Sequence, residues 1–361
     1  MQNKSYNICL VVGSLGMGGA ERSIVELANY LVSLNQNVAV ISLSQKEHFF
    51  YINNKVQVIE PMHYNKKKLI GSKFILGCKT LVFIRTAIKK LKPDVIYSVA
   101  LPTFFLLSTI GIFYPIIISI RCNPLNHKLI DPSPLFIKRL VFRRASGIIA
   151  QTEFAATQLK KMTNHSNIVV IPNYLRFIED SEVIKKKHII NVSRFTKEKG
   201  HKYLLEAFSL IHKKDWKLIL VGDGILRKSL MEYAEQLGIS NHVEFIGEKN
   251  NVDFYLKQSE IFVFSSISEG FPNALLEAMA TPLPCISFDC DAGPSEIICN
   301  MENGILVKTK DVISLAEKMS LLMEDEKLRE KLMNNSIKVR EQFRIDIIAD
   351  RYFRFLLENL N

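Results

Sequence analysis

Short apolar runs that alternate with amphipathic segments constrain the fold of this 361-residue chain more than any other feature. Runs of four to seven mostly apolar residues recur along the sequence, and segments with helical spacing of apolar residues separate them. Strands without polar alternation are buried on both faces, as in a parallel sheet covered by helices. The pattern predicts an α/β fold with two doubly wound sheets.

The expected elements follow from the same pattern. In the first half we expect strands at residues 6–12 and 38–43, with a helix over residues 20–34 between them. In the second half we expect six strands, at residues 188–193, 216–222, 242–247, 260–266, 284–289 and 304–307. From Asp311 onward the chain is expected to be helical, and residues 346–360 carry an aromatic stripe suited to packing on a neighbouring domain.

Charge divides the chain at a polar stretch around residue 180. Residues 1–178 hold 22 Lys and Arg against 7 Asp and Glu, whereas the remainder holds 25 against 29. A composition shift at a polar stretch is typical of a linker between domains. We therefore predict a first domain over residues 1–178, a linker over 179–187, a second domain over 188–343, and a C-terminal helix over 344–361 that packs back on the first domain.

Two other features concern the cellular context. Residues 95–120 carry no charge and are long enough to span a bilayer, but Pro102 and Pro115 divide them into pieces of strand, helix and strand length. We expect a buried β-α-β stretch, with a transmembrane helix as the alternative. The apolar run near the N-terminus is expected to be a first strand rather than a signal peptide. The six cysteines lack zinc-finger spacing and are expected to be reduced thiols.

A glycine-rich loop over residues 13–19 follows the first expected strand. Its register is G-x-x-G-x-G-G, whereas a dinucleotide fingerprint requires G-x-G-x-x-G. The second strand also lacks a ribose-binding acid at its end, where residues 42–44 read Ser-Leu-Ser. These departures disfavour NAD binding. An anion or sugar contact is favoured, with a simple tight turn as the alternative.

A basic loop, RFTKEKG over residues 194–200, follows the strand at 188–193. Arg194 and Lys199 are five residues apart on a loop closed by Gly200, so they can hold two phosphate groups from different sides. The alternative is a solvated basic loop.

The most specific segment is SEGFPNALLEAMA, residues 268–280, which follows the strand at 260–266. Pro272 and Asn273 are expected to begin a helix whose N-terminus points at the site. Asn273 and Glu277 are four residues apart and share a face, while Leu275, Leu276 and Met279 are expected in the core. Glu277 can accept hydrogen bonds from a ribose diol, and Glu269 from sugar hydroxyls. The alternative is a solvated Glu on an ordinary helix.

Together these segments resemble glycosyltransferase family 4, whose members are retaining enzymes that use nucleotide-sugars. The matching motifs are GGAER at 18–22, RFTKEKG at 194–200, LVGDG at 220–224, FIGEKNNV at 245–252 and EGFPNALLE at 269–277. The resemblance covers nearly the whole chain. It implies the GT-B fold, in which two Rossmann-like domains face each other and a C-terminal helix crosses back.

The resemblance also implies roles for individual residues. Arg194 and Lys199 would hold the diphosphate, Glu277 the ribose, and Glu269 the transferred sugar, so Arg194, Lys199 and Glu269 are the expected catalytic group. The expected donor-binding residues are Gly18, Gly19, Gly222, Gly247, Gly270, Phe271, Asn273 and Glu277.

One motif departs from the family pattern. Many members carry a His after a first-domain strand such as the one expected at residues 115–119, but Arg121 stands there, in Ser-Ile-Arg-Cys-Asn-Pro. This sequence resembles the S-x-R-N-D-P variant of bacterial surface-polysaccharide transferases. We expect Arg121 or Asn123 to contact a phosphate or hydroxyl of the sugar or acceptor. His127 does not fit the spacing and is expected to be a surface residue.

The expected activity is transfer of a hexose or N-acetylhexosamine from a UDP-sugar to a saccharide acceptor in bacterial O-antigen, capsule or glycan assembly. We expect this acceptor to be linked to a lipid diphosphate. The family needs no divalent metal, and we expect no metal site and no cofactor besides the substrate. The alternatives are an epimerase of the same fold, or a non-catalytic sugar-binding assembly protein. The sequence leaves open the donor sugar, the acceptor, the linkage and the choice of UDP over GDP.

The basic first half suggests an anionic partner. Clusters at residues 66–68, 89–92 and 138–144 adjoin large apolar residues, as in helices that lie on membranes, although helices with solvated basic faces are equally consistent. No nucleic-acid recognition motif accompanies the charge, so nucleic acid is not expected as a partner. We expect a cytoplasmic protein bound peripherally to the anionic inner face of the plasma membrane.

Overall fold

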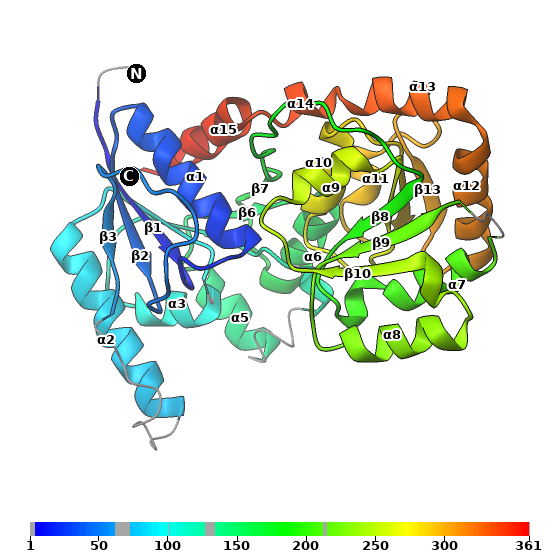
Figure 1. The fold of residues 1–361 in the computed structure, drawn as a ribbon. Helices are drawn as coiled ribbons and strands as arrows, with labels where there is room; N and C mark the ends of the chain where they lie inside the picture. The colour runs from blue at the N-terminus through cyan, green and yellow to red at the C-terminus, as the bar shows by residue number, and fades with distance from the viewer. Residues whose placement is uncertain (1–3, 62–72, 101, 127–133, 212–214, 361) are drawn as a thin grey trace. The chain divides into compact units, whose positions relative to one another are not determined.

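The computed structural model describes residues 4–61, 73–100, 102–126, 134–211 and 215–360 (Figure 1). The chain forms two compact units, the first made of Met1–Tyr174 with Ile345–Asn361 and the second of Leu175–Arg344. Each unit is built around one sheet of parallel strands. The basic cluster expected at residues 66–68 and His127 lie outside the described residues.

The first unit contains a seven-stranded sheet in the order β3-β2-β1-β4-β5-β6-β7. Its strands are β1 (Asn7–Val12), β2 (Asn37–Ser42), β3 (Gln57–Ile59), β4 (Val95–Ser98), β5 (Ile116–Ser119), β6 (Gly147–Ala150) and β7 (Ile168–Val170). Helices cover both faces of the sheet, and the side chains of its central strands are therefore buried on each side. These helices are α1 (Gly19–Ser33), α2 (Lys73–Leu91), α3 (Pro102–Ser108), α5 (Leu135–Phe142), α6 (Glu153–Thr163) and α15 (Ile345–Glu358), with the short η1 (Pro124–Asn126).

The uncharged stretch at residues 95–120 forms β4, α3 and β5, as the two prolines predict. All four residues of β4 and of β5 are buried within the sheet. Among the helices of the described residues, none is long and apolar enough to cross a bilayer. The alternative of a transmembrane helix at this stretch is therefore wrong.

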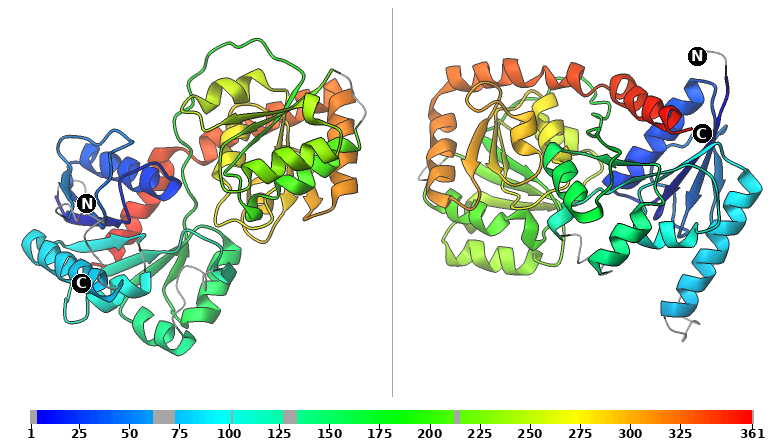
Figure 2. Two further views of the ribbon diagram at one scale, coloured as in Figure 1. Left: turned by 60° about the horizontal axis from the view of Figure 1, so that its bottom comes forward. Right: turned by 180° about the vertical axis from the view of Figure 1, so that it is seen from behind.

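The C-terminal helix α15 packs against the first unit through its aromatic stripe. Tyr352 is 1% exposed, and its ring centroid lies 5.8 Å from that of Tyr97 on β4. A Cβ at Gly147 would approach the Phe355 ring to 2.7 Å, so β6 and α15 meet closely at this glycine. Figure 2 shows α15, in red, beside α1, and the Tyr30 hydroxyl of α1 donates a hydrogen bond to the Asp346 carbonyl.

The second unit contains a six-stranded sheet in the order β10-β9-β8-β11-β12-β13. Its strands are β8 (His188–Val192), β9 (Lys217–Val221), β10 (Val243–Gly247), β11 (Ile261–Phe264), β12 (Cys285–Asp289) and β13 (Ile305–Lys308). All six coincide with the strands predicted from sequence to within two residues. The helices are α7 (His201–Ser209), α8 (Arg227–Gln236), α9 (Val252–Gln258), α10 (Asn273–Ala280), α11 (Pro294–Ile297), α12 (Val312–Glu324), α13 (Glu326–Ser336) and α14 (Val339–Gln342), with the short η2 (Lys197–Lys199) and η3 (Ser240–His242).

Both sheets reverse their strand order once, between β1 and β4 in the first unit and between β8 and β11 in the second. Counted within each unit, the order begins 3-2-1-4-5-6, which is the doubly wound arrangement of Rossmann-type folds. Ligands of such folds bind beyond the carboxyl ends of the strands where the order reverses. In the second unit, the loops at that point are those after β8 and β11.

Candidate active site

The loops after β8 and β11 are joined by hydrogen bonds, which brings two of the predicted motifs together. The Ser265 hydroxyl donates to the Lys199 carbonyl at 2.9 Å, and the Ile267 amide donates to the Glu198 carbonyl at 2.8 Å. Gly200 has φ +67, and a Cβ there would lie 2.0 Å from the Ser265 carbonyl oxygen. Only glycine fits this position, because the loops approach each other through their backbones.

Lys199 and Glu269 form an ion pair across these two loops. The Lys199 Nζ lies 2.6 Å from the Glu269 Oε1, and the two side chains are 16% and 9% exposed. The sequence analysis assigns Lys199 to the diphosphate and Glu269 to the sugar. In this ion pair the two groups neutralise each other. Arg194, on the same loop as Lys199, is exposed to solvent.

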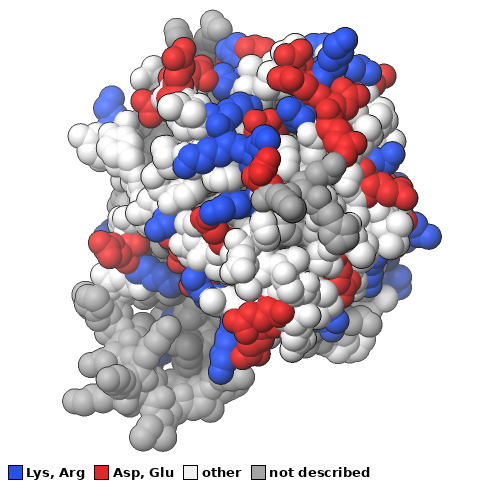
Figure 3. All heavy atoms as spheres, turned by 45° about the vertical axis from the view of Figure 1, so that its right-hand side comes forward, with Lys and Arg blue, Asp and Glu red and all other residues white. Residues whose placement is uncertain are grey.

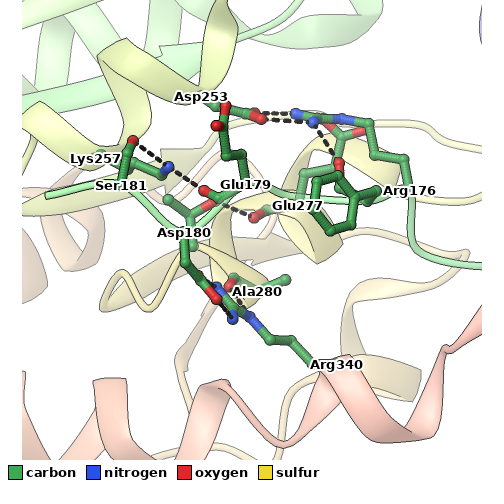
Figure 4. Close-up of polar contacts among 11 residues, drawn as sticks. Arg176, Glu179, Asp180, Ser181, Asp253, Lys257, Glu277, Ala280 and Arg340 are labelled. Carbon is green, nitrogen blue, oxygen red and sulfur yellow. Dashed lines mark hydrogen bonds and ion pairs between the residues drawn. The ribbon is translucent and has the colours of Figure 1, made fainter.

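Glu277 lies on the second turn of α10, where its carboxylate contacts a cation that the sequence did not reveal. The Arg176 Nη2 lies 3.1 Å from the Glu277 Oε2. The same guanidinium forms a two-point contact with Asp253, which lies in the first turn of α9. Figure 4 shows Arg176 reaching between the two carboxylates. Leu275, Leu276 and Met279 of α10 are buried, as the helical spacing predicts.

The remaining residues of the second unit that are predicted to bind the donor lie at strand ends or at the start of α10. Phe271 is 7% exposed, and its ring packs 6.2 Å from that of Phe343, so its backbone rather than its side chain can meet a ligand. Gly270 precedes it, and Asn273 is the first residue of α10. The Gly222 amide donates to the Gly247 carbonyl at 2.9 Å, which joins the ends of β9 and β10.

His201, the first residue of α7, lies buried beneath the loop after β8. Its Nε2 is 3.0 Å from the Ser193 hydroxyl oxygen. Because the Ser193 hydroxyl donates to the Asn191 side chain at 2.8 Å, the imidazole must be the donor and carries its proton on Nε2. Burial, and secondarily the charge of Lys199, lower the pKa of His201 to about 4. This residue is neutral at physiological pH.

Arg121, in the first unit, points its guanidinium into the protein. Its Nη1 donates to the Ser23 hydroxyl at 3.1 Å and to the Asn173 side chain, and its Nη2 donates to the Tyr97 hydroxyl at 2.9 Å. The guanidinium also lies 5.8 Å from the centre of the Tyr352 ring on α15. Arg121 therefore ties β4, α1 and the C-terminal helix together.

Three other predicted residues lie in the first unit. The Asn123 side chain is buried, and its Oδ1 accepts a hydrogen bond from the Leu125 amide at 2.9 Å, which stabilises η1. Gly18 and Gly19 begin α1 after the loop that follows β1. A Cβ at Gly18 would lie 2.2 Å from the Glu21 carboxylate, which folds back over this turn.

The expected basic cluster at residues 138–144 is only partly a surface feature. Lys138 is 3% exposed, and Arg144 donates to the carbonyls of Ile112 and Tyr114. Arg139 on α5 is exposed, and so is Arg143, which directly follows the end of this helix. They border a pocket of about 220 Å³ whose other lining residues are Leu140, Thr163 and Asn164. The surface charge of this helix thus comes from two arginines, because the helical spacing turns Lys138 inward.

Sequence reasoning missed Arg176, Asp253 and His201. Arg176 lies in the polar stretch that separates the two halves, and Asp253 resembles an ordinary acidic residue in the first turn of a helix. The two are 77 residues apart in sequence. Nothing in the local pattern around either residue indicates that they meet.

Known structures share this fold over almost the full chain. A mutant of S. aureus TarM, in complex with fondaparinux, alpha-GlcNAc-glycerol and UDP, matches with a TM-score of 0.81 and 14% identity over 97% of this chain and 99% of that one. The two doubly wound units are those of the GT-B fold, and the protein is a glycosyltransferase.

Two family models match this chain and identify its family among the glycosyltransferases. Residues 17–175 match the family described as Glycosyltransferase Family 4, and residues 176–339 match Glycosyl transferases group 1. The chain belongs to glycosyltransferase family 4, as its motifs predict.

Two curated relatives align over most of the chain. One is a Campylobacter jejuni protein that is 26% identical over 98% of this chain and 99% of its own length. Its name is GalNAc-alpha-(1->4)-GalNAc-alpha-(1->3)-diNAcBac-PP-undecaprenol alpha-1,4-N-acetyl-D-galactosaminyltransferase. The amylovoran biosynthesis glycosyltransferase AmsD of Erwinia amylovora is 25% identical over 89% of this chain and 91% of its own.

Proposed function

We propose that this glycosyltransferase is a retaining enzyme that moves a hexose or N-acetylhexosamine from a UDP-sugar to a lipid-diphosphate-linked saccharide. The supporting observation is the joined pair of loops after β8 and β11, which gathers Lys199 and Glu269 where the strand order of the second unit reverses. The UDP in the TarM complex and the lipid-linked acceptor in the name of the Campylobacter relative support the two substrates.

In this proposal the second unit binds the donor. Arg194 and Lys199 hold the diphosphate, and Glu277 accepts hydrogen bonds from the ribose. Glu269 and the backbone of Gly270 and Phe271 contact the transferred sugar. The base lies near Gly222 and Gly247, and Asn273 completes the site at the start of α10.

The proposed reaction breaks the bond between the anomeric carbon and the β-phosphate oxygen. The acceptor hydroxyl oxygen forms a new bond to that carbon on the same face, so the configuration is retained. The departing phosphate oxygen takes the proton of the acceptor hydroxyl. Arg194 and Lys199 stabilise the negative charge that grows on the leaving diphosphate, and this stabilisation is greatest in the transition state.

We propose that these two cations carry out the charge neutralisation for which other nucleotide-sugar enzymes use a divalent metal. Activity should accordingly survive chelation with EDTA. Complete loss of activity in EDTA, restored by magnesium or manganese, would contradict this part of the proposal.

The first unit would bind the acceptor, and its Gly18 and Gly19 would contact the donor from that side. Arg121 or Asn123 would contribute a contact to a phosphate or hydroxyl in place of the histidine found in many family members. The inward contacts of Arg121 to Tyr97, Ser23 and Asn173 leave its Nε without a protein partner among the described residues.

We also propose that the enzyme acts at the cytoplasmic face of the plasma membrane, bound peripherally through α5. On this helix Phe136 and Leu140 are 71% and 68% exposed and lie beside the exposed Arg139 and Arg143. Exposed apolar side chains next to cations are typical of helices that lie on anionic bilayers. By contrast, basic and acidic side chains are interspersed over the face that Figure 3 shows.

The test of this function is an acceptor-dependent assay. UDP-sugars and GDP-sugars are screened with a lipid-diphosphate acceptor, and the products are identified by mass spectrometry. Transfer of one sugar with release of UDP only when acceptor is present supports the proposal. Formation of an altered nucleotide-sugar in the absence of acceptor, with no release of UDP, would favour an epimerase instead. The name of the Erwinia relative assigns it to amylovoran biosynthesis, so the screen should also include polysaccharide acceptors.

A further inference from the structure

Arg176 connects the proposed ribose ligand to a second carboxylate. Its Nη1 donates to the Asp253 Oδ2 at 2.8 Å, and its Nη2 contacts both the Asp253 Oδ1 and the Glu277 Oε2. One guanidinium nitrogen is thus shared by two carboxylates from different helices (Figure 4). A planar guanidinium fixes the direction of each contact, because its hydrogen atoms have fixed positions.

The three side chains are largely withdrawn from water. Arg176 and Glu277 are each 17% exposed, and Asp253 is 25% exposed. Burial by itself would lower the pKa of Arg176, but the hydrogen bonds that it donates to Asp253 and the charge of Glu277 raise this pKa above its ordinary value. The guanidinium is therefore permanently charged. Without it, the two carboxylates would lose the cation that they share.

We propose that Arg176, held by Asp253, is a positioning residue that orients Glu277 toward the ribose diol of the donor nucleotide. The inference rests on the proposed function, since it requires that Glu277 binds the ribose. A carboxylate oxygen has two lone pairs, so the Glu277 Oε2 can accept from Arg176 and from a hydroxyl together. Arg176 itself does not contact the nucleotide.

The experiment measures the affinity of the full-length protein for two probes, UDP and 2′,3′-dideoxy-UDP, by titration calorimetry. Because the second probe lacks both ribose hydroxyls, it cannot report on the contact with Glu277. We expect Arg176→Gln to weaken UDP binding about tenfold, as for the loss of one hydrogen bond to a charged group. The same substitution should leave the affinity for 2′,3′-dideoxy-UDP unchanged.

Two further variants test the arrangement of the charges. Arg176→Lys keeps the charge but loses the planar geometry, and it should weaken UDP binding less than Arg176→Gln does. The double variant Arg176→Gln, Asp253→Asn removes the facing carboxylate, so it should recover part of the affinity lost in the single variant. If Arg176→Gln fails to fold, Arg176→Lys keeps the proposal testable, because it should still weaken UDP binding while leaving the affinity for 2′,3′-dideoxy-UDP unchanged.

Arg340 provides the matched control. It forms a two-point contact with Asp180 in the same unit, and Figure 4 shows it near the end of α10. It lines a pocket of about 610 Å³ whose lining includes none of the proposed donor residues. Arg340→Gln should leave the affinity for both probes unchanged.

The outcomes separate this inference from the proposed function. If Arg176→Gln lowers the affinity for both probes equally, the role of Arg176 is structural and the positioning inference is wrong. If Glu277→Gln weakens UDP binding but Arg176→Gln does not, the inference fails while the proposed function stands. If Glu277→Gln leaves UDP binding unchanged, the assignment of the ribose to Glu277 fails and the inference fails with it.

Discussion

Lys199 and Glu269, 70 residues apart in sequence, form an ion pair 2.6 Å long between the loops after β8 and β11. The proposed function gives each of them a different part of the donor. If a diphosphate binds Lys199 as proposed, Lys199 gains a second anionic partner, and the negative charge of Glu269 opposes that binding. Under the proposed function, the ion pair would therefore link diphosphate binding to the release of Glu269 for contact with the sugar.

This coupling predicts opposite effects of Glu269→Gln on binding and turnover. With the carboxylate removed, Lys199 is free for the diphosphate, so UDP should bind more tightly by roughly 1 kcal/mol, about fivefold. Turnover of the UDP-sugar should fall, because the contact to the transferred sugar is lost. Titration calorimetry with UDP measures the change in affinity, and kcat measures the change in turnover. Weaker binding of UDP by the variant would show that Glu269 does not compete for Lys199.

Arg194→Ala and Lys199→Ala should each lower kcat, by about 100-fold, because each cation stabilises charge that develops on the leaving group. Only Lys199→Ala should also destabilise the second unit, by about 1–3 kcal/mol, since it leaves the nearly buried Glu269 without its cation. Arg194 is exposed, and its removal should leave stability unchanged.

Urea unfolding followed by fluorescence measures that difference in stability. Trp216 is the single tryptophan of the chain and lies buried in the second unit, so it reports on that unit alone. Lys187→Ala serves as control, because Lys187 forms an exposed pair with Asp215. Equal unfolding midpoints for Lys199→Ala and Lys187→Ala would contradict the predicted stabilising role of Lys199.

Glu277→Ala should raise the donor KM by about one to two decades. Loss of a hydrogen bond to a charged partner costs roughly 1.5–3 kcal/mol, which corresponds to that range. The measurement is the donor KM at saturating acceptor, with circular dichroism to confirm that the variant is folded. A folded variant whose KM equals that of the wild type argues against ribose binding by Glu277.

His201 predicts a loss of stability in acid. Its pKa is about 4 in the folded protein, whereas an unfolded histidine titrates near 6.5. As pH falls below about 6.5, the unfolded chain binds a proton that the folded chain does not, so stability decreases until the pH reaches about 4. Between pH 7.5 and pH 5 the expected loss is on the order of 2 kcal/mol.

The comparison with His201→Gln isolates this contribution from that of the carboxylates. The glutamine can still donate a hydrogen bond to Ser193 but takes up no proton, so its unfolding midpoint in urea should fall less between pH 7.5 and pH 5. The Trp216 signal follows the transition in both proteins. If the two proteins lose stability in parallel, His201 is not the group responsible.

Membrane binding through α5 should depend on salt and on two exposed arginines, Arg139 on the helix and Arg143 directly after its end. Each cation near an anionic surface contributes about 1 kcal/mol, and raising the salt to about 1 M shortens the Debye length to about 3 Å. The wild-type protein should co-sediment with anionic liposomes at low salt. The double variant Arg139→Glu, Arg143→Glu should not. The charge-matched control is Lys228→Glu with Lys327→Glu, two exposed lysines of the second unit. Failure of wild type to bind at low salt contradicts the surface assignment.

The sequence alone determined the α/β class with two parallel sheets, four strands of the first sheet (β1, β2, β4 and β5), all six strands of the second, and the loops that follow β8 and β11. These follow from local signals, because apolar runs, helical spacing, prolines and glycines act within a few residues of each other. The split of residues 95–120 into two strands and a helix at Pro102 and Pro115 is an example. The family motifs contain the residues that are proposed to bind the donor.

Only the tertiary structure decided which charges meet. Arg176 and Asp253, the pair behind Glu277, come from a connecting segment and a separate helix. Arg121 occupies the position of an expected ligand contact, yet its guanidinium binds Tyr97 and Asn173 inside the protein. Lys138 belongs to a basic cluster in the sequence but is buried in the fold. Such partners are set by packing between distant segments, and a local pattern records the charge of a side chain without recording what it faces.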